Sequence, residues 1–308
     1  MLMLAAARVC AYTIPYEAWM GTFVGDKKIG WMSMNIDKTE IDGAAGYKIS
    51  SVVSNRLTVL GSELTQLVNT DVYTDSKYRP IKETFSMSSG GKTTSVTATF
   101  YKDRIEYEVS AGTGNSKKSI PIPAGADLIA DPMFTTSEKF PGIGQECSLR
   151  YFNPLTLSLE DLTIKVHKRE RITINGKGYD TLAFDNITPI GSMSVWRSDS
   201  GDLVRIKGMM GITMEKMSRE EAIALGSEGQ ATDFAVLTSA KSNRPIENPR
   251  RIKTMKAVLQ GIDDPKMQIS DHRQKVTALK DKPGSVSFIV DAVRFDESKS
   301  GRVPIKAK

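Results

Sequence analysis

The sequence predicts a mainly β protein, in which a large curved antiparallel sheet, a meander or a half-barrel, is accompanied by a few short helices. Two observations lead to this prediction. Apolar and polar residues alternate with a period of two over many segments, which is typical of strands with one buried face. Short glycine-containing turns separate these segments, as expected where hairpins join neighbouring antiparallel strands.

The first hairpin is expected within residues 23–37, FVGDKKIGWMSMNID. Two stretches of strand-forming residues flank Gly25-Asp26-Lys27-Lys28, which would supply a polar turn. Asn175-Gly176 is a stronger hairpin signal, because both central residues of this turn type need a positive φ. Similar turn sequences stand at 42–43, 89–91 and 200–201.

The clearest strand is predicted over residues 162–174, LTIKVHKRERITI. Most of its apolar residues share one parity, so we expect one buried face and one wet face. Lys168 and Glu170 fall on the apolar side, and we therefore expect an edge or a bend there. The same alternation predicts strands over 93–101, 104–110, 203–217 and 285–295.

Three segments carry helical signals. Ser218-Arg219-Glu220-Glu221 fits a capping box, in which the Ser and the Glu three residues later each cap a backbone N–H of the first helical turn. A short helix is also predicted over residues 126–138, although Pro132 would interrupt it. Residues 249–260 place four apolar residues at helical spacing, so a helix is predicted there, with an irregular strand as the alternative.

Composition divides the chain into four parts. Residues 1–11, MLMLAAARVCA, are interpreted as a signal-peptide remnant, since an apolar run ends in a small-x-small pattern. Residues 12–225 are expected to form the curved antiparallel β-domain. Residues 226–248 are rich in Gly, Ser, Asn and Pro and are predicted as a linker. Residues 249–308 would form a small basic C-terminal unit with a helix and a final strand.

The net charge of +6 is concentrated in the C-terminal part. Residues 241–308 hold 16 Lys and Arg against 8 Asp and Glu, whereas the first 240 residues hold 26 against 28. The basic residues are interspersed with Asp, Pro and apolar residues and lack interleaved aromatics, so we expect a solvated surface and no nucleic-acid partner. No run approaches the roughly 18 apolar residues of a spanning helix, and no transmembrane segment is predicted.

No sequence motif indicates catalysis, a metal or a cofactor. Cys147 lies in a strand-like stretch, His167 on the polar face of 162–174 and His272 in a polar stretch, so each is interpreted as structural. The glycines of 112–119, GTGNSKKS, are expected to form a hairpin turn rather than a phosphate-binding loop. A pair of catalytic carboxylates leaves no sequence trace, so a hydrolase or transferase stays an alternative.

Large apolar side chains near glycine turns are the best candidates for a binding surface. The chain holds 14 methionines and 3 tryptophans, and thioethers line adaptable apolar grooves. The candidate ligand-binding residues are Trp19, Trp31, Met32, Met34, Trp196 and Met210. The alternative is that all six belong to the core, in line with the usual burial of these residue types.

Several stretches together resemble a known family. They are EAWMGTFVGDKKIGWMSM (17–34), TDVYTDSKYRPIKETFSM (70–87), FYKDRIEYEV (100–109), SIPIPAGADLIADPM (119–133), LRYFNPLTLSL (149–159), MSVWRSDSGDLVRIKGMMGITMEKMSREEA (193–222) and NRPIENPRRIKTMKAVLQG (243–261). Over nearly its whole length the chain resembles the non-catalytic N-terminal region of bacterial exported transglutaminase-like proteins. The resemblance implies an accessory module, because the motifs of the papain-like catalytic domain that follows in such proteins have no counterpart here. The architecture is also similar to periplasmic half-barrel families that include lipoprotein carriers.

Three functions are compatible with these observations. The first is a non-enzymatic exported binding or scaffold module, located in the periplasm or at the cell envelope of a bacterium, whose partner is an envelope protein, a polymer or a lipid. The second is a periplasmic carrier of a lipid or another hydrophobic ligand, which requires a deep apolar cavity of several hundred Å³. The third is a hydrolase or transferase, which requires a cleft with a titratable residue of strongly perturbed pKa. Of these three functions, the sequence favours the non-enzymatic binding or scaffold module, followed by the carrier and then the enzyme.

Overall fold

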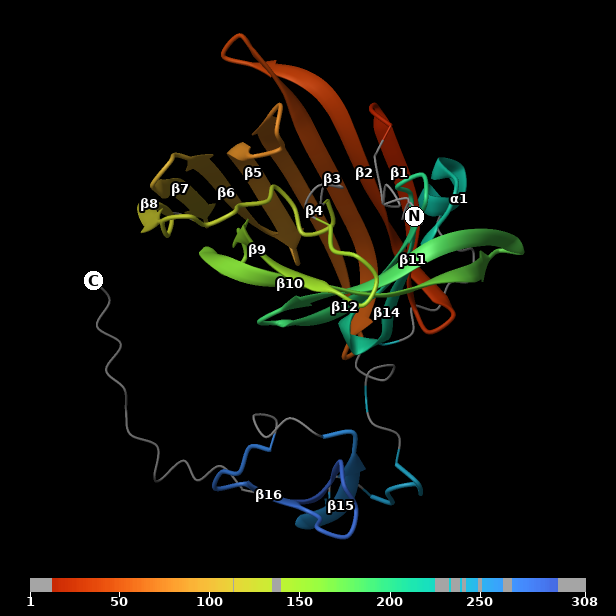
Figure 1. Cartoon of the computed structure of the whole chain (residues 1–308). Helices are drawn as coiled ribbons and strands as arrows, with labels where there is room; N and C mark the ends of the chain where they lie inside the picture. The colour runs from red at the N-terminus through yellow and green to blue at the C-terminus, as the bar shows by residue number, and fades with distance from the viewer. Residues whose placement is uncertain are drawn as a thin grey trace, which may run out of the picture. The chain divides into compact units, whose positions relative to one another are not determined.

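The computed structural model describes residues 13–112, 114–134, 140–224, 233, 239, 242–248, 251–262 and 268–292 (Figure 1). The chain divides into two compact units, Met1–Ser239 and Ala240–Lys308. The boundary between the units lies within residues 226–248, the range predicted as a linker. Residues 1–11, interpreted as a signal-peptide remnant, lie outside the described residues.

The first unit is built on a single antiparallel sheet of 14 strands. The strands are β1 (Tyr16–Val24), β2 (Lys27–Ile41), β3 (Ala44–Val59), β4 (Ser62–Asp75), β5 (Pro80–Ser89), β6 (Lys92–Phe100), β7 (Arg104–Ala111), β8 (Gly114–Pro121), β9 (Glu146–Asn153), β10 (Ser158–Ile174), β11 (Lys177–Thr188), β12 (Gly191–Ser198), β13 (Leu203–Lys207) and β14 (Ile212–Lys216). A short helix, α1 (Arg219–Ile223), follows β14. The prediction of a mainly β protein with a large antiparallel sheet is confirmed.

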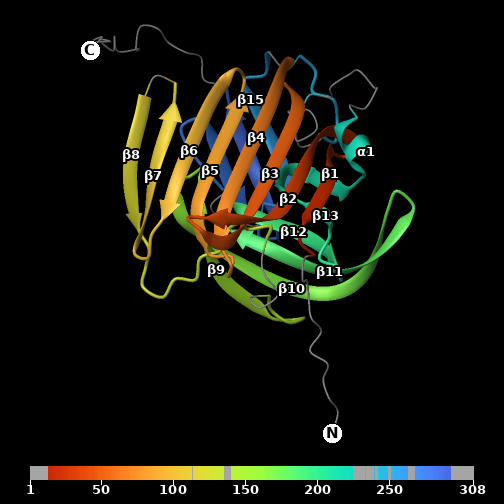
Figure 2. The ribbon, with the colours of Figure 1, turned by 90° about the horizontal axis from the view of Figure 1, so that it is seen from above.

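Two meanders make up this sheet, β1 to β8 and β9 to β14, and they are joined where β1 pairs with β14. The sheet is not closed, because β8 and β9 form its two edges. Figures 1 and 2 show how it curls: β2 to β7 form one wall, and β9 to β12 form a second wall that crosses it. We name the face that the two walls turn toward each other the inner face.

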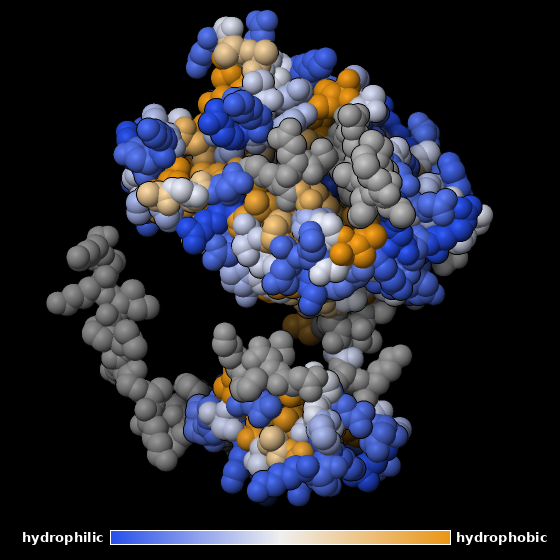
Figure 3. All heavy atoms as spheres, in the orientation of Figure 1, coloured by the Kyte–Doolittle hydropathy of each residue, from blue (hydrophilic) through white to orange (hydrophobic). Residues whose placement is uncertain are grey.

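The inner face carries the hydrophobic core. Met20, Met34, Leu162, Ile164 and Phe184 are among its fully buried members, and they come from β1, β2, β10 and β11. Burying a large apolar side chain stabilises the fold by about 1.5–3 kcal/mol. In Figure 3 most of the visible surface of this unit is hydrophilic, and hydrophobic side chains gather between the two walls. The period-two alternation of the sequence therefore places apolar residues on the buried inner face and polar residues on the solvent-exposed outer face.

A second, smaller apolar cluster connects β5, β6 and β7 with β9. Phe85, Val96, Ala98, Ile105, Tyr107 and Phe152 are its buried members. Phe152 of β9 crosses the opening between the walls, since its ring centroid lies 5.6 Å from that of Tyr107 and 6.1 Å from that of Phe100. This contact brings the two edges of the sheet close together although they share no ladder of hydrogen bonds.

Residues 122–134, which follow β8, begin on the surface and enter the core at Ile129 and Phe134, and we name them the strap. Phe134 is buried in the core. Two side chains of the second wall hold the strap by its backbone: Asn186 Nδ2 donates to the carbonyl of Pro132 at 2.8 Å, and Arg197 Nη2 donates to that of Met133 at 2.7 Å. The helix predicted at 126–138 is wrong for its described part, because turns and bridges occupy it and side chains take up its carbonyls.

Local signals in the sequence correspond closely to the observed turns. Asn175 and Gly176 both have positive φ, 47° and 77°, and join β10 to β11 as predicted. The first hairpin has the predicted place, although its turn is only Gly25-Asp26 and the two lysines belong to β2. Ser218 and Glu221 form the predicted capping box at the start of α1.

The long strand β10 bends where the sequence predicts an edge or a bend. The register with β11 shifts between Val166 and Lys168, so His167 is an extra residue in the strand. A bulge of this kind kinks its strand and increases the local twist. Beyond it, β10 and β11 continue as a hairpin that extends past the end of β12, because β12 pairs with β11 only from Thr181 onward.

The second unit contains a sheet of three described strands, β15 (Thr254–Gln260), β16 (Gln274–Ala278) and β17 (Ser285–Asp291), in the order β15-β17-β16. The helix predicted over 249–260 is wrong: residues 254–260 alternate between exposed and half-buried and pair with β17. Val258, placed on the apolar face of that helix, is exposed. A final strand within 285–295 is confirmed. Across the described residues of the chain, no helix has the length and apolar character needed to span a membrane.

Candidate functional site: a groove on the outer face

A row of residues crosses the outer face of the sheet at its centre. Trp31, Gly21, Glu215, Arg205 and Trp196 stand opposite one another on β2, β1, β14, β13 and β12. We name these five residues the outer row. With neighbouring strands about 4.8 Å apart, the row spans about 19 Å. It exists only because β1 pairs with β14.

Helix α1 packs on β1 and β2 at the Trp31 end of the outer row. The rings of Trp19 and Trp31 lie 5.3 Å apart, and the Arg219 guanidinium lies 5.5 Å from the Trp19 ring. Lys28 Nζ donates to the carbonyls of Glu221 and Ala224, so a cation satisfies the free carbonyls at the C-terminal end of the helix. Burial lowers the pKa of Lys28.

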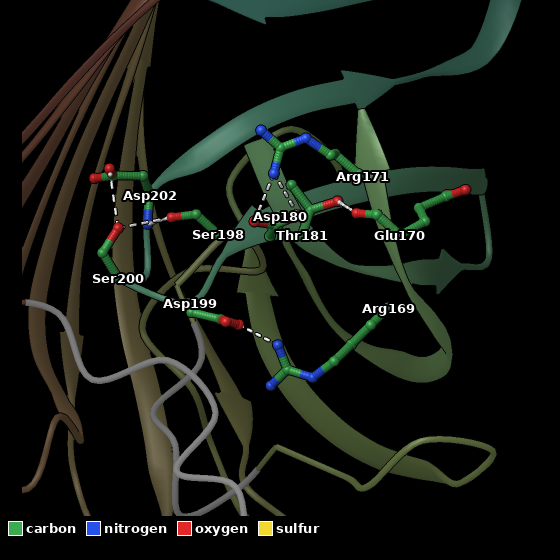
Figure 4. A network of polar contacts seen from close by, with 9 residues as sticks. All are labelled: Arg169, Glu170, Arg171, Asp180, Thr181, Ser198, Asp199, Ser200 and Asp202. Carbon is green, nitrogen blue, oxygen red and sulfur yellow. Dashed lines mark hydrogen bonds and ion pairs between the residues drawn. The ribbon is translucent and has the colours of Figure 1, made fainter. Parts of the chain in front are cut away.

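The hairpin formed by residues 168–180, which we name the arm, approaches the other end of the outer row. Trp196 Nε1 donates to Glu170 Oε1 at 2.8 Å, and Arg205 Nη2 donates to the carbonyl of Thr173 at 3.4 Å. At the base of the arm, Arg169 and Asp199 point toward each other and form an ion pair (Figure 4). Polar contacts therefore hold the arm beside the sheet.

A groove of about 460 Å³ lies between the tip of the arm and the outer face. Phe23, Gly25, Asp26, Asn175, Arg205, Lys207, Thr213, Glu215 and Met217 line it. Gly21 keeps its floor open for Met217, because a Cβ on Gly21 would lie 2.7 Å from Met217 Sδ. The groove is thus mainly polar and charged, and Phe23 and Met217 supply its apolar contacts.

The electrostatics of the groove are nearly balanced. Arg205 Nη2 lies 2.7 Å from Glu215 Oε1, and the two side chains are 22% and 23% exposed. Lys207 Nζ lies 5.6 Å from the centroid of the Trp196 ring, a cation–π geometry. Asp26 adds one more carboxylate. Such a surface offers aromatic faces for stacking and both signs of charge for hydrogen bonding.

The six predicted binding residues do not form one surface. The tryptophans Trp19, Trp31 and Trp196 all lie on the outer face, half-buried, in or beside the outer row. Met32 and Met34 point the opposite way and are buried in the core. Met210 lies in the 3-10 turn Met209–Gly211 and is 60% exposed. The alternative that all six are core residues describes Met32 and Met34 only.

Residues that sequence reasoning missed supply the middle of the site. Arg205 and Lys207 alternate with Val204 and Ile206 in β13, which marks them as outer-face residues. Nothing local in the sequence shows that Glu215 faces Arg205 or that Gly21 faces Glu215. That information lies in the pairing of β1 with β14, whose partners are about 190 residues apart.

The residues weighed for catalysis have structural surroundings. Cys147 is a half-buried residue of β9 as predicted, and burial raises the pKa of its thiol. His167 Nε2 lies 2.8 Å from Asp185 Oδ2, and His272 is an exposed residue of the second unit. No cluster of three or more His, Cys, Asp or Glu suited to a metal ion occurs among the residues described.

A buried acid lies on the inner face, away from the groove. Glu83 of β5 is 5% exposed, and its cross-strand neighbours are Val72 in the main core and Ala98 in the smaller cluster. Burial, and secondly the charge of Asp131 in the strap, raise the pKa of Glu83 to about 8. Burial also raises the pKa of Asp131. These carboxyl groups lie between the two apolar clusters, and the groove does not include them.

Comparisons with known proteins give no family. No family model matches the sequence, and no curated protein matches it. A solved structure of a β-barrel-like protein, a domain of unknown function DUF1849 from Brucella abortus, is 11% identical with a TM-score of 0.44; the match covers 67% of this chain and 96% of that one. A "putative lipoprotein" from Parabacteroides distasonis is 12% identical with a TM-score of 0.27, over 67% and 95%. The resemblance to transglutaminase-like proteins stays a prediction from the sequence.

Proposed function

We propose that this protein is a non-enzymatic, exported module that binds an extended segment of a partner protein of the bacterial cell envelope. The observation that supports this function is the outer row with its groove: two aromatic residues about 19 Å apart flank an ion pair and a glycine on one strip of sheet. An extended chain of about six residues has the same length.

The chemistry of the groove suits a peptide backbone. Phe23 and Met217 provide apolar contact, and the Trp196 ring provides a face against which a side chain can stack. Lys207 and Arg205 can donate hydrogen bonds to carbonyl or carboxylate oxygens, and Asp26 and Glu215 can accept them from N–H groups. A partner with alternating polar and apolar groups would satisfy all of these.

Tryptophan fluorescence offers a direct test, because all 3 tryptophans of the chain lie in or beside the outer row. We would titrate the purified protein with arrays of unstructured peptides from envelope proteins and follow the emission. We expect a saturable change in emission with one class of peptide. The double variant Lys207→Ala, Trp196→Phe should weaken that binding about tenfold or more.

A control and a competing outcome make the test decisive. Lys118→Ala, on exposed strand β8 far along the sheet, should bind as the unchanged protein does. Equal binding by the double variant would contradict the proposed groove. Organic extraction of the natively purified protein followed by mass spectrometry tests the carrier alternative, and one lipid per chain would replace the peptide module with a carrier.

A further inference from the structure

The arm is the part of the β10–β11 hairpin with which no other strand pairs. Among the described residues, β9 pairs with β10 only up to Lys165, and β12 pairs with β11 only from Thr181 onward. In Figure 2 this end of the hairpin projects beyond the neighbouring strands. The bulge at His167 lies directly before the arm, and a two-stranded hairpin alone is marginally stable in water. The position of the arm therefore depends on its contacts with the outer face.

One side of the arm faces the sheet. Glu170, Ile172 and Ile174 share a parity in β10 and are half-buried or buried, whereas the residues between them are exposed. Ile174 is 3% exposed although it belongs to neither apolar cluster of the sheet. Because Ile174 precedes Asn175, which lines the groove, its burial depends on the arm lying against the outer face. Two isoleucines and one acid therefore form the docked side of the arm.

The carboxylate of Glu170 links the arm to the sheet. Its Oε1 accepts a hydrogen bond from Trp196 Nε1 of β12 at 2.8 Å, and its Oε2 lies 3.0 Å from Lys168 Nζ at the base of the arm. The hydrogen bond from Trp196, then that from Lys168 and the charge of Lys207, lower the pKa of Glu170. An indole N–H and a lysine that both belong to the sheet therefore favour a carboxylate at this position.

This carboxylate position is open to exchange. The Glu170 side chain is 30% exposed, and contacts between exposed charges contribute little to stability. Lys207 is an exposed residue of β13 that lines the groove and lies over the Trp196 ring. When the arm undocks, Trp196 Nε1 loses its acceptor and Lys207 loses the nearby charge of Glu170. Both groups then offer donors to another carboxylate at the Trp196 end of the outer row.

We propose that Glu170 is a latch that holds the arm against the sheet, and that a carboxylate of the partner segment takes its place. This inference rests on the proposed function, because the segment is the one that binds along the outer row. The incoming carboxylate accepts from Trp196 Nε1 and Lys207 Nζ, while the arm is released about the His167 bulge. Since the arm and the segment compete for the same donors, docking of the arm lowers the apparent affinity for the segment. The partner is thereby narrowed to an extended segment with an acidic group near one end.

Hydrogen exchange of the full chain tests the latch without a ligand. In Glu170→Ala, the backbone amides of residues 171–179 should exchange about tenfold faster, because an undocked hairpin frays. The amides of β4 and β5 should keep the rates of the unchanged protein. A matched control is Glu108→Ala, which removes a partly exposed ion pair with Lys117 between β7 and β8 and should leave exchange in the arm unchanged. Unaltered exchange of the arm in Glu170→Ala would overturn the latch.

Three synthetic peptides test the carboxylate. Each is acetylated and alternates Ser and Val over about six residues. The first carries a Glu near its amidated end, the second carries Gln at that place, and the third carries the Gln together with a free C-terminal carboxylate. Calorimetry should show at least one acidic peptide binding about fivefold more tightly than the neutral one. Which of the two gains affinity distinguishes a side-chain carboxylate from a chain terminus.

The Glu170→Ala variant completes the test. Without the competing latch, it should bind the favoured acidic peptide about fivefold more tightly than the unchanged protein does, whereas Glu108→Ala should bind it equally. Equal binding of all three peptides, or an unchanged affinity of Glu170→Ala, would overturn the latch and leave the peptide-binding module in place. Binding of no peptide by either protein would overturn the proposed function together with this inference.

Discussion

Charged side chains occur on both faces of the central sheet, in very different surroundings. On the inner face, Glu83 and Arg197 are 5% and 1% exposed. On the outer face, Arg205 and Glu215 keep about a fifth of their surface and pair with each other. The difference teaches that buried Arg197 holds the strap in the core and that burial favours the neutral form of Glu83, whereas the partly exposed outer pair can exchange its partners for those of a ligand.

Glu83 offers the largest expected effect. With its pKa near 8 in the folded state and the usual 4.5 when unfolded, folding takes up a proton between these values, so the free energy of unfolding falls as the pH rises from 4.5 to 8. The loss amounts to about 4 kcal/mol by pH 9. Glu83→Gln should therefore match the unchanged protein at pH 4.5 and exceed it by about 4 kcal/mol at pH 9 in urea unfolding.

Asp131 acts in the same direction, since burial raises its pKa too. For this reason some pH dependence should persist in the Glu83→Gln variant. Identical slopes of unfolding free energy against pH for both proteins would show that Glu83 is ionised in the fold at neutral pH. A matched control is Glu40→Gln, at an exposed glutamate of β2, which should not reproduce the gain in stability at pH 9.

Arg197 comes next. Its guanidinium lies 5.6 Å from the Phe140 ring and 5.4 Å from the Phe184 ring and donates to the carbonyl of Met133. Arg197→Ala would leave that carbonyl buried without this donor and open a cavity, at a cost of about 3 kcal/mol. Urea unfolding should show it, and limited proteolysis should cut faster within the strap. A cost below about 1 kcal/mol would contradict the role of Arg197 in holding the strap.

The smallest effect is expected for the outer ion pair. Arg205 and Glu215 are partly exposed, so a double-mutant cycle with Arg205→Ala and Glu215→Ala should give a coupling energy of about 0.5–1 kcal/mol. This weakness would allow a ligand to displace one partner at little cost. A coupling above about 3 kcal/mol would make the pair a structural element like Arg197 and remove it from the proposed binding surface.

Sequence reasoning succeeded where the information is local. Alternation predicted most of the strands, Asn175-Gly176 predicted a turn with two positive φ values, and Ser218 with Glu221 predicted a capped helix. The single strand predicted over 203–217 is wrong, because a turn at Met209–Gly211 divides it into β13 and β14. The helix predicted at 249–260 failed because spacing of apolar residues over so short a stretch fits either a helix or a strand, and pairing with β17 decided between them.

The candidate site was predicted in part. All three tryptophans lie in or beside the outer row, although none lines the groove. Met32 and Met34 could not share a face with Trp31, because residues an odd number of positions apart in a strand point to opposite sides. Arg205 and Glu215 could not have been recognised as partners of Gly21, because their meeting depends on the register between β1 and β14. A long-range register of this kind leaves no mark in the local pattern.

The pairing of β1 with β14 has a consequence for how the chain is made. β1 leaves the ribosome before β14, and the strand that covers its free side is synthesised about 190 residues later. During that interval β1 presents an unpaired edge to every neighbouring nascent chain. A holding chaperone that occupies this edge until β14 arrives would protect the growing polypeptide, and ribosomes stalled just before Ile212 would be the place to find it bound.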